Sequence, residues 1–156
     1  MAKYTATIRW QLNNKSDFLK NQYSRGHIWS FDGGIEVAAS SSPHVVPLPM
    51  SIEKAVDPEE SFIASVASCH MLWFLSFAAQ KDFVVETYID DASGIMRKNS
   101  EGKIAITSIS LCPKTKFSNE KLPTFSELQS LHHVAHESCF IANSIKSEIH
   151  CKPELT

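Results

Sequence analysis

Residues 57–79 constrain the fold of this chain more than any other stretch, because they predict a long and almost wholly apolar helix. Asp57 is a favourable N-cap residue, Pro58 suits the first helical position, and Glu60 completes an Asp-x-x-Glu capping box. The large apolar side chains that follow do not keep to one stripe, which predicts a helix buried on all sides. These side chains are Phe62, Ile63, Val66, Leu72, Trp73, Phe74, Leu75 and Phe77.

The same stretch is long enough to raise the alternative of a membrane-spanning helix. Polar residues interrupt it, however, and no second apolar run of this length accompanies it in the sequence. We therefore expect a core helix of a soluble protein and no membrane partner. The interrupting residues are Ser61, Ser65, Ser68, His70 and Ser76.

Composition favours a single domain spanning residues 1–156, because 43% hydrophobic content in 156 residues suffices for one core and no linker divides the chain. The 15 basic and 17 acidic residues are scattered and give a net charge of -2, so we expect no nucleic-acid partner. The start of the chain lacks the pattern of a secretion signal, which predicts a cytoplasmic protein with four cysteine thiols. The sequence contains no Cys-x-x-Cys pair, so it does not indicate a zinc ribbon or a thioredoxin motif.

The chain before the helix predicts a three-stranded sheet. Residues 4–12 alternate between apolar and polar side chains, which is typical of a strand with one buried face. Residues 27–31 and 35–39 flank Asp32-Gly33-Gly34, a turn that joins antiparallel strands. Residues 40–56 contain three prolines and several serines, which predicts an irregular loop.

After the helix, residues 83–90, 95–98 and 103–112 predict a second antiparallel sheet. Thr124 and Glu127 form a capping box at the start of a second helix, with Cys139 on its apolar face. Residues 145–151 alternate as a final strand. Together these elements predict an α+β domain with antiparallel sheets packed around two long central helices. Since a single chain of this size cannot cover so apolar a first helix, we expect an intertwined homodimer.

Cys69 lies in the middle of the first helix and is the candidate reactive residue. A buried helical cysteine is usually an ordinary core residue, and reactivity requires surroundings that favour the thiolate. Two other features of the sequence favour a reactive rather than a structural role for Cys69. It follows Glu59 of the helix start by ten residues, and a second cysteine, Cys139, is centred in the predicted second helix.

With these features the chain resembles the OsmC/Ohr family of thiol-dependent peroxidases, named for osmotically inducible protein C and organic hydroperoxide resistance, over nearly its whole length. The resemblance implies that Cys69 is the peroxidatic cysteine, that Cys139 is the resolving cysteine, and that Pro58-Glu59 is the family's helix start. It also implies an arginine from the N-terminal sheet region beside the reactive thiol. The segment of residues 23–27 resembles that position and makes Arg25 the candidate.

The chemistry suits these residue types. A thiolate attacks the O–O bond of a peroxide, and a guanidinium would hold Cys69 as thiolate because its charge does not titrate away. Glu59 would orient Arg25 through a forked ion pair. Ten residues of helix rise about 15 Å, so Arg25 must bridge Glu59 and Cys69, or the glutamate must come from the dimer mate.

The family resemblance further implies an organic or fatty hydroperoxide as substrate, an external dithiol of the lipoyl type as reductant, and no cofactor. Two departures concern the finer assignment. Cys139 is followed by Phe140 rather than proline, while a Cys-Pro pair occurs at Cys112-Pro113. Residues 70–73, directly after Cys69, resemble the OsmC-like branch more than the organic-hydroperoxide branch.

Three alternatives stay open. His132, His136 and Cys139 fall on one helical face at a spacing that could ligate a transition metal, with His133, His150 and Cys151 nearby in sequence. The same fold could also serve as a non-catalytic redox sensor or small-molecule binder. A Cys–His hydrolase using His70 is disfavoured, because adjacent helical residues diverge by about 100°.

Overall fold

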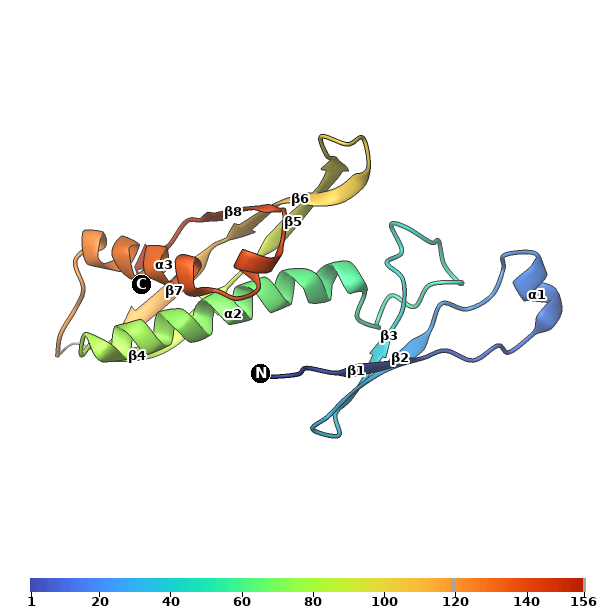
Figure 1. The fold of residues 1–156 in the computed structure, drawn as a ribbon, viewed down its shortest axis with the longest axis horizontal. Helices are drawn as coiled ribbons and strands as arrows, with labels where there is room; N and C mark the ends of the chain where they lie inside the picture. The colour runs from blue at the N-terminus through green and yellow to red at the C-terminus, as the bar shows by residue number, and fades with distance from the viewer. Residues whose placement is uncertain (119, 156) are drawn as a thin grey trace. The chain divides into compact units, whose positions relative to one another are not determined.

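The computed structural model describes residues 1–118 and 120–155, and its chain divides into two compact units, Met1–Ser61 and Phe62–Thr156. Each unit is described by itself. Their elements are labelled in Figure 1. That all 156 residues form one domain stays a prediction.

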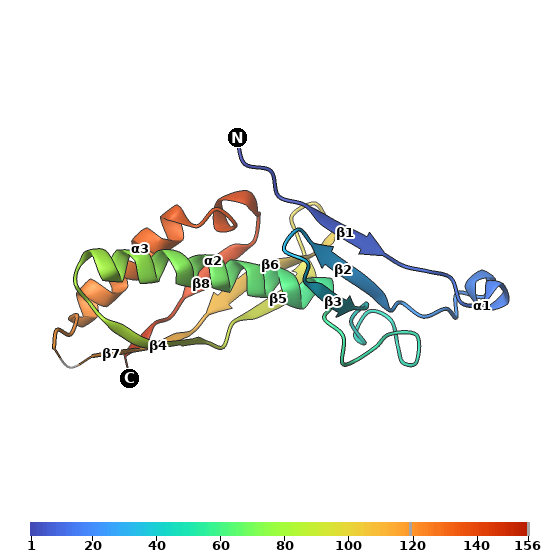
Figure 2. The same cartoon turned by 90° about the horizontal axis from the view of Figure 1, so that it is seen from below.

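The first unit contains the predicted three-stranded sheet, formed by β1 (Ala6–Arg9), β2 (His27–Phe31) and β3 (Glu36–Ala39). Both pairings are antiparallel, and the three strands are visible side by side in Figure 2. The turn between β2 and β3 places Gly34 at a φ of 82°, a backbone conformation that glycine adopts without a steric penalty. The Phe31 and Ile35 backbones close this hairpin through a hydrogen bond of 3.0 Å. The hairpin and the irregular loop of residues 40–56 are confirmed.

The first unit differs from the sequence prediction in two respects. The predicted buried face of the first strand is exposed, since all of β1 is solvent-accessible and Ile8 retains 59% of its accessible surface. In addition, a short helix, α1 (Lys15–Leu19), begins after Asn14, whose side chain accepts a hydrogen bond of 2.9 Å from the Ser16 backbone. The sequence of α1 is too short and polar for helical periodicity to reveal it.

The long helix α2 (Pro58–Gln80) starts as predicted. The backbone N–H of Glu60 donates to the Asp57 carboxylate at 2.7 Å, and the Glu60 side chain accepts from the Asp57 backbone N–H at 3.3 Å. The prediction that this helix is buried on all sides is wrong for the single chain. Only one stripe of α2, with a spacing of four residues, is inaccessible to solvent. This stripe consists of Val66, His70, Phe74 and Ala78.

By length and composition α2 could cross a membrane, but a core helix of a soluble protein passes the same test. Its buried stripe makes the contacts of a core helix. Phe74 and Ala78 pack with buried side chains that include Phe117 and Leu128, and Val66 packs with Ile109. We therefore retain the core-helix interpretation.

The second unit contains two small sheets. One has the order β4 (Val85–Asp90), β7 (Pro113–Phe117), β9 (Glu154–Leu155), and the other has the order β5 (Ser93–Lys98), β6 (Ile104–Leu111), β8 (Glu148–Cys151). The pairs β4/β7 and β5/β6 are antiparallel as expected, whereas β8 and β9 join in parallel.

Both sheets depart from the sequence prediction at residues 112 and 113. The predicted strand 103–112 ends at Leu111, and β7 is a further strand that was not predicted. Asp90 marks this change of sheet, because its carboxylate accepts a hydrogen bond of 2.7 Å from the Cys112 backbone N–H.

The second long helix, α3 (Phe125–Ser138), begins with the predicted capping box. Thr124 accepts a hydrogen bond from the Glu127 backbone, and the Glu127 side chain accepts one from the Thr124 backbone. With 14 residues it is shorter than the 23-residue α2. The apolar periodicity predicted Cys139 in the middle of this helix. Cys139 is instead the C-cap residue, in extended conformation, and a 3-10 turn, η1 (Ala142–Ser144), follows.

Candidate functional site

Cys69 and Cys139 are brought together in the second unit. Cys69 is half-buried on α2, whereas Cys139 is completely buried, and both are free thiols. The two side chains are near neighbours, since Cys69 lies close enough to Cys139 to contribute to the shift of its pKa. Burial, and secondarily this contact with Cys69, raise the pKa of Cys139 to about 11. The Cys139 side chain is therefore a neutral thiol at physiological pH, placed beside a more accessible second thiol.

The end of α3 explains the position of Cys139. Its backbone N–H donates to the His136 carbonyl at 3.1 Å, and its carbonyl accepts from the Asn143 N–H at 3.0 Å. The Asn143 side-chain amide also donates to the Glu137 carbonyl at 2.9 Å, and the Ala142 N–H points to the Cys139 sulfur at 3.4 Å. These contacts hold the thiol at a helix end rather than along a helix face.

Aromatic side chains border the two cysteines. Trp73, one turn after Cys69 on α2, packs edge to face against Phe140, the residue after Cys139, with ring centroids 5.5 Å apart. Trp73 also stacks on Phe77 at 5.5 Å. The thiol pair therefore lies next to an apolar surface that is partly open to solvent, since Phe140 is exposed.

Arg25 belongs to the first unit. Its guanidinium lies over the Tyr23 ring at 3.7 Å from the centroid, and it donates to the Tyr23 carbonyl at 2.5 Å and to the Asn21 side chain at 2.7 Å. Among residues 1–118 and 120–155, Arg25 forms no ion pair with Glu59, so the forked pair predicted within one chain is not found. A glutamate from a dimer mate stays a prediction.

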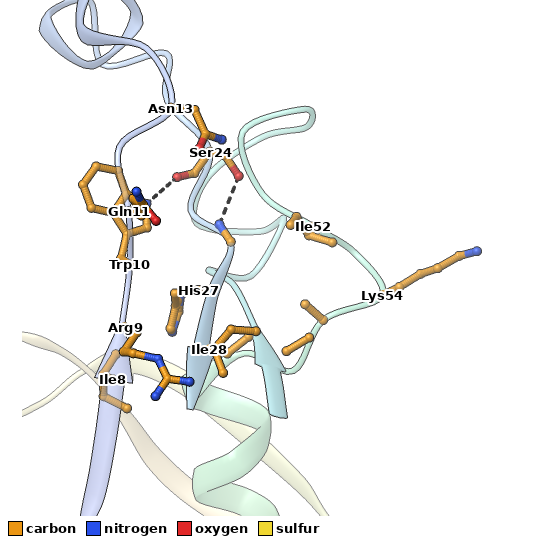
Figure 3. Close-up of a pocket in the computed structure, with 14 residues that line it drawn as sticks. Ile8, Arg9, Trp10, Gln11, Asn13, Ser24, His27, Ile28, Ile52 and Lys54 are labelled. Carbon is orange, nitrogen blue, oxygen red and sulfur yellow. Dashed lines mark hydrogen bonds between the residues drawn. The ribbon is translucent and has the colours of Figure 1, made fainter. Parts of the chain in front are cut away.

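Two recesses lie in the first unit. The smaller, about 380 Å³, is lined by Arg25 and by the aromatic side chains of Trp10, Phe18 and Tyr23. The larger, about 950 Å³, is drawn in Figure 3. There the Trp10 indole N–H donates to the Ser24 carbonyl at 2.9 Å. Neither recess is lined by a thiol, because all four cysteines belong to the second unit.

The alternative metal set of His132, His136 and Cys139 does not form a cluster among the described residues. Cys139 lies near Cys69, while His132 lies with His70 and with Cys151, which belonged to the wider group of candidates. His70 Nε2 lies 2.9 Å from His132 Nδ1, and the Cys151 sulfur lies 3.8 Å from His70 Nε2. Burial is the main cause of all three pKa shifts. It lowers the pKa of His70 to about 4 and that of His132 to about 3, and it raises that of Cys151 to about 12.

The sequence did contain one indication of this cluster. His70 occupies the same stripe as Val66 and Phe74 at a spacing of four residues, so it is a polar group among core positions. A buried polar group requires a partner. The partners, however, come from α3 and β8, which sequence spacing could not identify. The remaining histidines of the predicted group are not among these three residues. His133 and His136 line the same recess as His132 and Cys151, with His133 exposed and His136 half-buried, and His150 is exposed.

Comparison with known proteins identifies the family of this chain. A family model described as OsmC-like protein matches residues 52–154, more than half of the chain. The chain belongs to the OsmC-like family. No curated protein matches it in a sequence search.

Among solved structures, an OsmC-like protein of unknown function from Vibrio cholerae is 49% identical, with a TM-score of 0.96 over 99% of this chain and 100% of the other. Two more distant structures share the fold. An OsmC-like protein from Mycoplasma pneumoniae has 16% identity and a TM-score of 0.72, covering 99% of this chain and 98% of its own. The organic hydroperoxide resistance protein OhrB of Bacillus subtilis has 18% identity and a TM-score of 0.67 over 99% of this chain and 98% of its own.

Proposed function

We propose that this protein is a thiol-dependent peroxidase that reduces organic hydroperoxides, with Cys69 as the peroxidatic and Cys139 as the resolving cysteine. The observation that carries the proposal is the proximity of the two thiols, which come from different helices. Membership of a family that includes hydroperoxide resistance proteins supports it.

The unequal surroundings of the two thiols support the division of roles. Cys69 is half-buried and can meet a dissolved peroxide, whereas Cys139 is inaccessible and its raised pKa keeps it protonated. A protonated, buried thiol does not compete for the peroxide, because the thiolate is the nucleophile. The aromatic surface formed by Trp73 and Phe140 suits the organic part of the substrate better than it suits water.

The proposed reaction balances in three steps. The Cys69 thiolate attacks the terminal oxygen of ROOH, the O–O bond breaks, and the products are a Cys69 sulfenic acid and an alcohol, which takes up a proton. The Cys139 sulfur then displaces hydroxide from the sulfenic sulfur, giving a Cys69–Cys139 disulfide and water. An external dithiol, of the lipoyl type, reduces the disulfide by exchange and is itself oxidised to a disulfide.

Arg25 and Glu59 are proposed as the charged groups that activate Cys69. A guanidinium stays positive at every physiological pH and so favours a neighbouring thiolate. The stacking of Arg25 on Tyr23 and its two hydrogen bonds restrict the rotamers of a long side chain. We further propose a cytoplasmic homodimer, in which Glu59 of one chain reaches Arg25 of the other.

The test is turnover of cumene hydroperoxide and of hydrogen peroxide by metal-free protein, with dithiothreitol or dihydrolipoamide as reductant. We expect Cys69→Ser to lower turnover at least about 1000-fold, as loss of a catalytic nucleophile does. Cys112→Ser is the matched control, because Cys112 lies outside the thiol pair, and it should retain wild-type turnover. Arg25→Met should slow the reaction of Cys69 with peroxide by about tenfold or more.

If wild-type protein is as inert as the Cys69→Ser variant, the proposal of peroxidase activity is contradicted. Oxidation of Cys69 by one equivalent of peroxide without continued turnover would instead indicate a redox sensor with the same fold.

A further inference from the structure

The second unit contains a cluster of three potential metal ligands that the proposed peroxidase reaction does not use. His70 comes from α2, His132 from α3 and Cys151 from β8, and these elements are labelled in Figure 1. His70 Nε2, His132 Nδ1 and the Cys151 sulfur all lie within 4.8 Å of one another. Both imidazoles are buried and Cys151 is half-buried.

We propose that His70 Nε2, His132 Nδ1 and Cys151 Sγ form a binding site for a borderline-soft divalent metal ion of the Zn²⁺ class. Two imidazole nitrogens and one thiolate are ligands that such ions prefer. The site shares no residue with the Cys69–Cys139 pair, so it goes beyond the proposed peroxidase and stands or falls independently of it.

The spacing of the three atoms fits a metal ion. With Zn–N bonds of about 2.0–2.1 Å and a Zn–S bond of about 2.3 Å, a tetrahedral site separates two nitrogens by roughly 3.3 Å and a nitrogen from a sulfur by roughly 3.6 Å. The corresponding distances here are 2.9 Å between His70 Nε2 and His132 Nδ1 and 3.8 Å between Cys151 Sγ and His70 Nε2. Shifts of a few tenths of an ångström, which side-chain rotation supplies, convert one arrangement into the other.

The protonation state of the rings also suits a cation. Two neutral imidazoles facing each other share one proton, and the ring that accepts it must carry its own proton on the far nitrogen. Those far nitrogens, His70 Nδ1 and His132 Nε2, are buried and have no hydrogen-bond partner among the described residues. A metal ion would bind the lone pairs of the two facing nitrogens, so each far nitrogen would carry a proton and would donate it to water or to another acceptor.

Charge around the cluster is complementary to a cation. Asp90 is half-buried, with its Oδ2 atom buried and unpaired among the described residues, as is the Tyr88 hydroxyl. Both belong to the same environment, because the charge of Asp90 contributes to raising the pKa of Tyr88 and that of Cys151. A divalent ion would offset the Cys151 thiolate and the Asp90 carboxylate together. The carboxylate and the hydroxyl would then be available as outer partners of the ligand imidazoles.

An ion can reach the cluster from solvent. His132 and Cys151 line a recess of about 280 Å³, which also contains His133 and His136. Three protein ligands leave a fourth tetrahedral position for water, as in metal sites that remain open to exchange. Binding requires the thiolate, so one proton should leave Cys151 for each ion bound.

The test uses full-length protein stripped with a chelator, reduced, and titrated with Co²⁺ as the spectroscopic probe and Zn²⁺ as the competitor. We expect one ion per chain, a thiolate-to-cobalt charge-transfer band in the near ultraviolet, release of one proton, and displacement of Co²⁺ by Zn²⁺. Cys151→Ser should abolish the band, and His132→Gln should weaken Zn²⁺ binding at least about 100-fold, since even outer partners change affinity by 10–100-fold.

Cys112→Ser and His133→Gln are matched controls, because each changes a residue of the same type outside the three ligands, and both should bind as wild type does. Circular dichroism confirms that each variant is folded. Wild-type protein without the charge-transfer band at stoichiometric Co²⁺ would overturn the proposal whatever the variants do. A band that survives in Cys151→Ser but disappears in Cys139→Ser would assign the metal to the thiol pair and overturn it equally.

Discussion

The two sides of α2 differ although both are built from the same apolar composition. On one side Val66, His70, Phe74 and Ala78 are inaccessible and pack within the second unit. On the other side Cys69 is half-buried and Leu72, three residues further, retains 63% of its accessible surface. Cys69 and His70 are consecutive residues, and the helical rotation of about 100° between them separates a thiol–thiol contact from an imidazole–imidazole contact.

This difference shows that the chemistry available on each side of α2 depends on burial rather than on residue type alone. An accessible thiol beside a second thiol is suited to oxidation by a dissolved peroxide, whereas neutral imidazoles shielded from water are suited to holding an ion or to staying uncharged. The buried side should therefore respond to changes in packing and pH, and the open side to oxidants and to a second chain.

The largest expected effect on stability is at the buried side. Phe74→Ala removes a completely buried ring that stacks on His132 with centroids 4.2 Å apart, so it should lower the free energy of unfolding by about 3–5 kcal/mol. Phe125→Ala is the control, because that ring is 58% exposed and its loss should change stability by less than about 0.5 kcal/mol. Urea unfolding of both variants measures the difference, and equal values would erase the distinction between buried and exposed sides.

A second effect follows from the histidines of the buried side. In the folded state the pKa is about 4 for His70 and about 3 for His132, below the ordinary 6.5, so both rings are neutral when folded. Below pH 6.5 the unfolded chain binds more protons than the folded chain, and stability falls. Between pH 7 and pH 5 we expect metal-free protein to lose about 2 kcal/mol for each histidine.

Urea unfolding at a series of pH values checks this expectation. His132→Gln should remove about half of the pH-dependent loss, while His133→Gln, which changes an exposed residue, should leave it unchanged. A loss of the same size in all three proteins would show that other groups cause it.

The open side should be covered by a second chain in the proposed homodimer. Leu72→Asp would then place a charge in an apolar interface and raise the dimer dissociation constant by about 30-fold or more, equivalent to about 2 kcal/mol. Sedimentation of wild-type and variant protein over a range of concentrations measures it. Lys81→Asp, three residues beyond a buried alanine at the helix end, is the charge-change control. If wild-type protein is a monomer at micromolar concentration, the proposed homodimer is contradicted.

The features that could be predicted from sequence are those set by nearby residues. The capping boxes of α2 and α3 join residues three apart, and the β2–β3 turn depends on a glycine in the left-handed region. The Cys69–Cys139 pairing was expected from the family resemblance rather than from spacing. The two thiols are near neighbours in the second unit, and their roles stay a prediction.

What escaped prediction depends on distant contacts. Apolar periodicity predicted Cys139 inside a helix. In the structure α3 ends at Ser138, one residue before Cys139, where the Asn143 amide and the η1 turn follow. The parallel pairing of β8 with β6 brings Cys151 towards His70, 81 residues away in sequence, and local pattern carries no information about that register. The apolar face of β1 was expected to be buried, yet all four residues of the strand are exposed.

The most direct test of the central claim is to identify the bond that peroxide forms. Reduced protein receives one equivalent of cumene hydroperoxide, free thiols are alkylated, and peptides are identified by mass spectrometry. The account predicts a disulfide between Cys69 and Cys139 in most chains, with Cys112 and Cys151 alkylated. Cys139 found alkylated while Cys69 accumulates as sulfenic acid, or a disulfide joining any other pair of cysteines, would contradict this expectation.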